Sequence, residues 1–203
     1  MMEIRSDLKV NIRVNGVAVS APVQAADSLL DFLRNHARAL DVKCGCNQGD
    51  CGTCTVIYDG KAVKSCLVLA AQADGKEVRS LKGLIDDPLM QSLQKAFLEC
   101  GAVQCGFCTP GILMASWSLL QDNPNPNRDQ MRQGISGNLC RCTGYKKIVD
   151  AIALTAAQQV REHPAGGYQV AAGYQAAANP ADPPDRLDGQ ARAKADYLLL
   201  GGG

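Results

Sequence analysis

The sequence predicts an α+β chain of two domains, a mixed domain with hairpins followed by an all-α domain. Three observations support this division. Before residue 83, residues 9–19 alternate between apolar and polar with period two, and Asn-Gly and Asp-Gly turns indicate two hairpins. From residue 86 onward, apolar residues recur at helical spacing, and each half contains its own set of closely spaced cysteines. We expect domains at 1–83 and 84–163, followed by a tail at 164–203.

The chain opens with a predicted hairpin and a short helix. Residues 9–19 alternate around Asn15-Gly16, the pair that most strongly indicates a two-residue hairpin turn. Asp27 or Ser28 can then cap a helix, because a short polar side chain accepts a hydrogen bond from the first N–H groups. The apolar face of that helix consists of Leu29, Leu30, Phe32 and Leu33.

A cysteine-rich loop follows the helix. Cys46, Cys51 and Cys54 have the spacing C-x4-C-x2-C, and Cys66 stands further on. This spacing with a distant fourth cysteine is that of plant-type [2Fe–2S] sites, and the glycines of the loop leave N–H groups to point at sulfur. A zinc site is the main alternative, although structural zinc sites usually pair two C-x2-4-C knuckles. A disulfide framework is less suited to a chain with no secretory leader.

A second hairpin and a last strand complete the first domain. The strand Thr55–Tyr58 leads through Asp59-Gly60 into a strand expected at 61–67, which would carry Cys66 back toward the loop. A last strand is expected at 77–80, after an Asp-Gly turn.

Four helices are predicted in the second domain. Asp87-Pro88 provides a cap and a first-turn proline for the first helix, and Thr109-Pro110 repeats that signal for the second. A shorter helix is expected at 128–133 and a long one at about 144–161.

Two cysteine pairs precede two of these helices. Cys105 and Cys108 stand before the second helix, and Cys140 and Cys142 before the last. Two helix N-termini can therefore direct N–H groups at one anionic site. The C-x2-C pair alone would also fit a zinc knuckle or a thiol–disulfide pair. The C-x-C pair suits two sulfurs on one iron better than a zinc knuckle.

Composition excludes several classes of function. A net charge of +1 with 20% charged residues gives no reason to expect nucleic acid or an anionic membrane as a partner. No apolar run is long enough for membrane insertion. Ten cysteines without a signal peptide indicate a reducing, cytoplasmic compartment and metal rather than disulfides. Aromatic residues make up only 4%, so small cores supported by bound cofactors are expected.

Three stretches of the chain, covering roughly residues 8–160, carry a family resemblance. They are Gly45-Cys46-x4-Cys51-Gly52-x-Cys54-Thr55-Val56 with Ser65-Cys66-Leu67, then Gln104-Cys105-Gly-Phe-Cys108-Thr-Pro-Gly111, and Gly137-Asn-Leu-Cys-Arg-Cys-Thr-Gly-Tyr145. They resemble the iron–sulfur (small) subunit of the molybdenum hydroxylases, the xanthine oxidase and aldehyde oxidoreductase family. The resemblance implies a β-grasp ferredoxin-like domain and a four-helix domain, each with one [2Fe–2S] cluster.

The resemblance also implies a function and partners. The subunit would pass electrons from molybdopterin on a large partner subunit, through two clusters, toward FAD or another acceptor. FAD commonly lies on a further, medium subunit. The small subunit itself has no catalytic residues, so it would be a non-catalytic part of an oxidoreductase complex.

The resemblance assigns roles to nine residues. One cluster would have the ligands Cys46, Cys51, Cys54 and Cys66, and the other Cys105, Cys108, Cys140 and Cys142. Gln104 and Cys142 match positions that lie against the pterin. Without the resemblance, Gln104 would be an ordinary capping or loop amide.

The remaining cysteines and histidines are expected to have no part in metal binding. Cys44 stands where the family has another residue type, and Cys100 lies at helical spacing as a small apolar residue. His36 and His163 flank helix ends, where they would be solvated or interact with the helix dipole.

The tail has the composition of a linker or disordered extension. Of its 40 residues, 21 are Ala, Gly or Pro. We expect it to contact a partner subunit, with Tyr168, Tyr174 and Tyr197 as anchors.

Two other functions remain open from the sequence. A free-standing ferredoxin-like carrier or redox sensor is the first, although the near-neutral charge, the second cluster domain and the tail favour a permanent complex. A structural zinc protein is the second.

Overall fold

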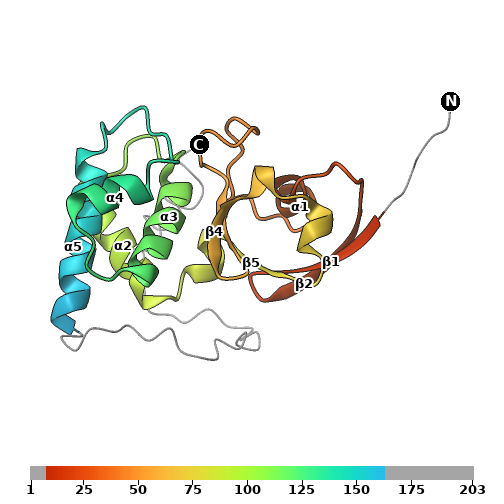
Figure 1. Cartoon of the computed structure of the whole chain (residues 1–203), viewed down its shortest axis with the longest axis horizontal. Helices are drawn as coiled ribbons and strands as arrows, with labels where there is room; N and C mark the ends of the chain where they lie inside the picture. Colours follow the sequence, from red (N-terminus) through yellow and green to blue (C-terminus); the bar gives the residue numbers. More distant parts are fainter. Residues whose placement is uncertain (1–7, 163–203) are drawn as a thin grey trace, which may run out of the picture.

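A five-stranded mixed sheet forms the first half of the computed structural model, which describes residues 8–162 (Figure 1). The strands are β1 (Leu8–Val14), β2 (Val17–Val23), β3 (Thr55–Tyr58), β4 (Lys61–Lys64) and β5 (Glu77–Arg79). They lie in the order β2-β1-β5-β3-β4. Strands β1 and β5 pair in parallel, and the other neighbours pair antiparallel. The last strand of the domain therefore lies at the centre of its sheet.

The two predicted hairpin turns are confirmed. Val14 pairs with Val17 across one turn, and Tyr58 with Lys61 across the other. Both turn residues have positive φ in each case: 51° and 82° at Asn15-Gly16, and 50° and 85° at Asp59-Gly60. This is the backbone of a type I′ turn, whose twist matches that of the strands it joins.

The short helix α1 (Leu29–Asn35) packs its apolar residues against the sheet. Ser28 is the N-cap: its Oγ accepts from the backbone N–H of Asp31 at 3.1 Å, and the Asp31 side chain accepts from the Ser28 backbone N–H at 3.2 Å. The first core consists of this helix and the inward residues of the strands, among them Ile12, Leu29, Leu33, Val56 and Val78. The sequence pattern had indicated the same helix face.

The prediction of a strand over 61–67 was wrong at its end. Strand β4 stops at Lys64, and Ser65–Leu67 form a 3₁₀ turn. The backbone N–H and the Oγ of Ser65 both donate to the Cys54 carbonyl, at 3.2 and 2.8 Å. These two bonds bend the chain toward the cysteine loop, so Cys66 lies on a turn rather than on a strand.

Four helices form the second half of the described chain, as predicted. They are α2 (Pro88–Glu99), α3 (Thr109–Asp122), α4 (Arg128–Gly134) and α5 (Lys146–Glu162). The carboxylate of Asp87 caps α2 by accepting from the Met90 N–H at 2.9 Å. The same oxygen accepts from the indole N–H of Trp117 at 2.9 Å, which ties the start of α2 to α3.

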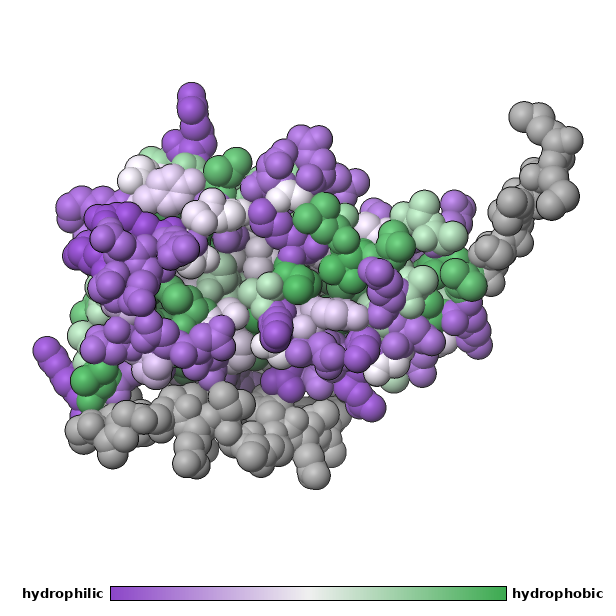
Figure 2. Space-filling model, in the orientation of Figure 1, coloured by the Kyte–Doolittle hydropathy of each residue, from purple (hydrophilic) through white to green (hydrophobic). Residues whose placement is uncertain are grey.

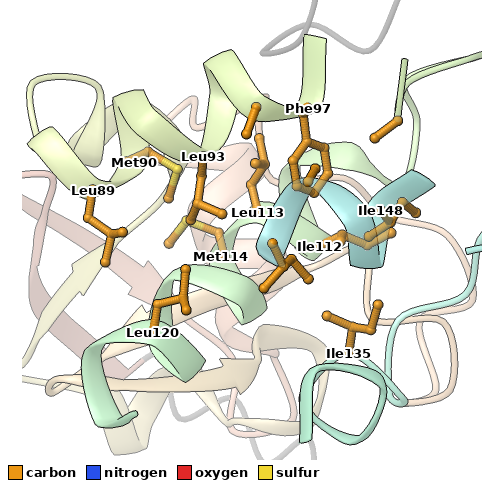
Figure 3. Close-up of a cluster of buried hydrophobic side chains, with 14 of the residues drawn as sticks. Leu89, Met90, Leu93, Phe97, Ile112, Leu113, Met114, Leu120, Ile135 and Ile148 are labelled. Carbon is orange, nitrogen blue, oxygen red and sulfur yellow. The ribbon is translucent and has the colours of Figure 1, made fainter. Parts of the chain in front are cut away.

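The second core lies between these helices, and Figure 3 shows Leu93 and Phe97 of α2 close to residues of α3 and α5. It also includes Ile57 of β3 together with Leu81 and Leu84, from the turn that joins the two halves. Helix α3 packs against β3 and β4, as Figure 1 shows. The two domains are therefore in direct contact, with β3 and β4 of the sheet packed against α3.

Some predictions concern residues outside the described range. His163 and the tail, including its three tyrosines, lie beyond residue 162. Within residues 8–162, no helix combines the length and the apolar character that a membrane span requires.

Candidate metal centres

The first thiol set (Cys46, Cys51, Cys54 and Cys66) lies on the loop between α1 and β3 and on the turn after β4. The backbone N–H groups of Cys51 and Gln48 donate to the Cys46 Sγ, at 3.3 and 3.5 Å. These bonds lower the pKa of the Cys46 thiol to about 6, the Cys51 N–H having the larger effect. The loop thus stabilises a thiolate at this position before any metal is considered.

Cys66 resists ionisation because it is buried beside other thiols of this set. Burial raises the pKa of Cys66 to about 11, and its contact with the Cys54 thiol and the charge of Cys46 add to the rise. The Cys51 Sγ lies 3.3 Å from the Thr53 hydroxyl. A thiol that resists ionisation beside other thiols is a donor suited to a cationic iron core, whose charge removes the cost of deprotonation.

The second thiol set (Cys105, Cys108, Cys140 and Cys142) lies at the N-termini of α3 and α5. The sulfurs of Cys105 and Cys142 are 3.6 Å apart, although the residues are separated by 37 positions. Burial raises the pKa of Cys108 to about 12, and the Cys140 thiol and the charge of Cys105 contribute further. Thiols of the two pairs therefore lie next to each other in the fold.

One thiol of the second set is also stabilised as an anion. Burial opposes ionisation of Cys140, but the Thr143 hydroxyl at 3.1 Å and the N–H groups of Thr143 and Cys142 lower its pKa overall. Contact with the Cys105 thiol raises the pKa of Cys142. Each set thus has one thiol whose pKa is lowered and at least one whose pKa is raised.

Tyr145 supports the second set in a way that sequence reasoning missed. Its hydroxyl accepts from the Cys140 backbone N–H at 2.8 Å and donates to the Asn138 carbonyl at 3.1 Å. Its backbone has a φ of 66°, which is uncommon for a bulky residue and costs energy. The only sequence signal for this role was its place at the end of the Gly137–Tyr145 motif.

The two thiol sets lie on loops that are hydrogen-bonded to each other. The Leu139 N–H donates to the Cys51 carbonyl at 2.9 Å, and the Asn138 amide donates to the Gly52 carbonyl at 2.8 Å. The approach is close because glycine stands on both sides. A Cβ on Gly52 would lie 2.3 Å from the Gly137 carbonyl oxygen, and one on Gly111 would lie 2.3 Å from the Gly52 carbonyl oxygen.

The remaining residues named from the sequence lie apart from these contacts or at their edge. Gln104 and Cys142 are exposed, beside Cys105. Cys44 is exposed, and His36 is an exposed residue at the C-terminus of α1. Cys100 is half-buried against the second core, and burial raises its pKa. Over residues 8–162, no group of three or more His, Cys, Asp or Glu side chains has the spacing to hold a single metal ion.

Replacing the two spare thiols should leave metal binding unchanged. We expect Cys44→Ser and Cys100→Ala to retain the full iron content of the wild type, because eight other thiols already form two sets of four. The measurement is iron and acid-labile sulfide per chain in the purified variants. Loss of half of the iron in either variant would mean that the ligand register is wrong.

Comparison with known proteins places two domain families on the chain. Residues 12–85 match a "2Fe-2S iron-sulfur cluster binding domain", and residues 80–153 match a "[2Fe-2S] binding domain". Each match includes one complete thiol set.

Relatives of this chain are known as separate subunits. The chain is 46% identical to the nicotine 6-hydroxylase small subunit of Paenarthrobacter nicotinovorans, over 71% of this chain and 87% of that one. It is 42% identical to the xanthine dehydrogenase iron-sulfur-binding subunit of Escherichia coli O157:H7, over 71% and 92%. Among solved structures, a chain of quinoline 2-oxidoreductase from Pseudomonas putida 86 superposes with a TM-score of 0.70 and 41% identity, over 76% of this chain and 97% of that one.

Proposed function

This chain belongs to the iron–sulfur subunits of the molybdenum hydroxylase family, and we propose that its two thiol sets hold two [2Fe–2S] clusters that act in series. It is an electron-transfer subunit of an oxidoreductase and performs no substrate chemistry itself. The observation that carries the serial arrangement is the hydrogen bond from the Leu139 N–H to the Cys51 carbonyl. Leu139 directly precedes Cys140, a proposed ligand of one cluster, and Cys51 is a proposed ligand of the other.

The proposed ligands of the plant-type cluster are the first thiol set, and those of the helical-domain cluster are the second. A [2Fe–2S] cluster supplies a carrier that takes up and releases single electrons. The chain supplies the thiolates and the N–H and hydroxyl donors around them. Donors to sulfur, such as the Cys51 N–H at Cys46 and the Thr143 hydroxyl at Cys140, stabilise the anionic state of a site and so tune its potential.

We propose that the molybdopterin of the large subunit lies next to the second thiol set. Cys105, Cys142 and Gln104 are exposed on this side. Phe107 and Leu139, next to the ligands, are 43% and 56% exposed, as expected of apolar residues that a partner covers. Gln104 has both a donor and an acceptor for the polar edge of a pterin. We infer that Gln104 and Cys142 contact it.

We propose that electrons leave the chain from the cluster at the first thiol set and pass to an FAD-binding medium subunit or another acceptor. Leu67, beside Cys66, is 65% exposed, and Leu40 and Leu69 are also exposed. Figure 2 shows apolar residues in a band across the visible face of the first domain. An apolar rim next to a ligand favours a docked protein partner over free solvent.

Two further parts of the proposal concern location and assembly. All ten cysteines are free thiols, which is consistent with the reducing cytoplasm. The residues beyond 162 remain predicted to contact a partner subunit. A free-standing carrier is not favoured, because the relatives named above are subunits of larger enzymes.

The metal content of the native protein tests this proposal. Two binuclear clusters require four irons and four acid-labile sulfides per chain, because each cluster has two of each. Two distinct paramagnetic signals are expected on reduction, since the two thiol sets differ in donors and burial. Stoichiometric zinc, or a single cluster signal in a fully loaded sample, would contradict it.

A further inference from the structure

The side chain of Lys64 lies between the two cluster loops. Lys64 is the last residue of β4 and is half-buried. Its ammonium donates to the Gly49 carbonyl, in the loop of the first thiol set, with an N···O distance of 2.6 Å. On its other side it lies against Gly137, where a Cβ would be 3.2 Å from the Lys64 Nζ. One positive charge therefore contacts the first loop and the segment that leads to Cys140.

The Gly49 carbonyl connects this charge to a ligand sulfur. The carbonyl of Gly49 and the N–H of Asp50 belong to the same peptide group, and that N–H is one of the backbone donors that lower the pKa of the Cys46 thiol, with a smaller effect than those of Cys51 and Gln48. A cation on the carbonyl oxygen polarises the peptide group and strengthens the hydrogen bond that its N–H donates. Lys64 thus acts on Cys46 without touching it.

The contact with the second loop is of a different kind. Against Gly137 the Lys64 side chain makes a packing contact, three residues before Cys140. The polarised peptide is directed only at the first loop. The charge should therefore affect the first thiol set more strongly than the second.

We propose that Lys64 sets the relative reduction potentials of the two clusters, holding the plant-type cluster higher so that electrons move to it from the helical-domain cluster. A cluster potential depends on net charge and on hydrogen bonds to its sulfurs, and Lys64 changes both at the first thiol set. This inference rests on the proposed function, because it requires both clusters to be present. Lys64 is a positioning and tuning residue, not a ligand.

Three variants separate the charge of Lys64 from its hydrogen bond and its packing. Lys64→Gln keeps a donor for the Gly49 carbonyl but removes the charge, whereas Lys64→Arg keeps the charge. Lys61→Gln is the matched control, since Lys61 is an exposed residue at the other end of the same strand. Each cluster-loaded protein is titrated with reductant while the two paramagnetic signals are followed.

In Lys64→Gln carrying one electron, we expect the ratio of reduced helical-domain cluster to reduced plant-type cluster to rise about tenfold. This corresponds to a change of about 59 mV in the difference between the two reduction potentials. Lys64→Arg and Lys61→Gln should stay within about twofold of the wild type. The proposal is overturned if Lys64→Gln leaves both potentials unchanged, or if it lowers both equally. It is also overturned if Lys64→Gln loses iron, because the residue would then hold the loop rather than tune it.

The same samples distinguish failure of this inference from failure of the proposed function. Four irons per wild-type chain with unchanged potentials in Lys64→Gln would refute the role of Lys64 alone. Zinc or a single cluster in the wild type would instead refute the assignment of the two thiol sets.

Discussion

Replacing Cys142 with alanine is expected to reduce the iron content from four to two per chain and to remove nearly all turnover of the assembled enzyme. Cys142 is one of four converging thiols, with its sulfur 3.6 Å from that of Cys105, and a binuclear cluster needs all four thiolates. Turnover should fall by more than about 100-fold, since even changes beside metal ligands cost about 10–100-fold. The measurements are iron per chain and steady-state activity of the complex.

Two variants serve as controls for Cys142→Ala. Gln104→Ala changes an exposed neighbour of the same site without removing a ligand, so it should keep four irons and lose less activity. Cys66→Ala should also lose two irons, but from the plant-type cluster. In that variant, substrate should still reduce the helical-domain cluster in a rapid-mixing experiment. If that cluster receives no electrons there, the proposed order of the two clusters is wrong.

Replacing Gly52 with alanine is expected to destabilise the contact between the domains. Gly52 has a φ of 69°, and its Cβ would lie 2.3 Å from the Gly137 carbonyl oxygen and 2.6 Å from the Asn138 amide nitrogen. The left-handed backbone costs a non-glycine residue about 1–2 kcal/mol, and forcing a methyl group into a packed site costs about 1–3 kcal/mol more. We expect the free energy of unfolding to fall by about 2–5 kcal/mol.

Gly75→Ala is the matched control for the effect of the backbone. Gly75 has a φ of 70°, but a Cβ there would meet nothing within 4 Å. It should therefore show only the conformational part of the loss, about 1–2 kcal/mol. Denaturant unfolding of the two cluster-loaded variants measures the difference. Equal destabilisation of the two proteins would mean that the close approach of Gly52 and Gly137 does not matter for stability.

The features that could be predicted from the sequence are turns and helix caps, in which the two hydrogen-bonded residues are only a few positions apart. The Asn15-Gly16 turn, the Ser28 cap and the Asp87 cap each depend on atoms no more than three positions away. The residue types at these few positions identify such turns and caps, because few residue types satisfy their geometry. The positions of the helices and hairpins followed from these signals together with the apolar spacing.

The thiol sets were predictable in part. Spacing alone indicated the first set. The second set was inferred from two cysteine pairs, more than thirty positions apart, that each precede a helix N-terminus, and the resemblance then assigned all four to one cluster. The end of β4 was mispredicted because the apolar Val63 and Leu67 continue a strand-like pattern. The hydrogen bonds of Ser65, which override that pattern, go to the carbonyl of Cys54, the residue just before the paired strand β3.

The contacts between the two halves could not be predicted at all. The Asn138 amide reaches the Gly52 carbonyl across 86 positions, and the Leu139 N–H reaches the Cys51 carbonyl. Neither has a periodic or capping signal, because both follow from how the domains meet. The sequence shows only that glycines are present, and glycine allows two backbones to approach closely.

Strand β3 contributes side chains to the cores of both domains. Val56 is buried in the first core and its neighbour Ile57 in the second, since successive residues of a strand point to opposite faces. Exchanging either half for a domain of another protein would leave one of these side chains without its packing partners. The pair should therefore be retained or lost as one evolutionary unit, and recombination between the halves should be rare.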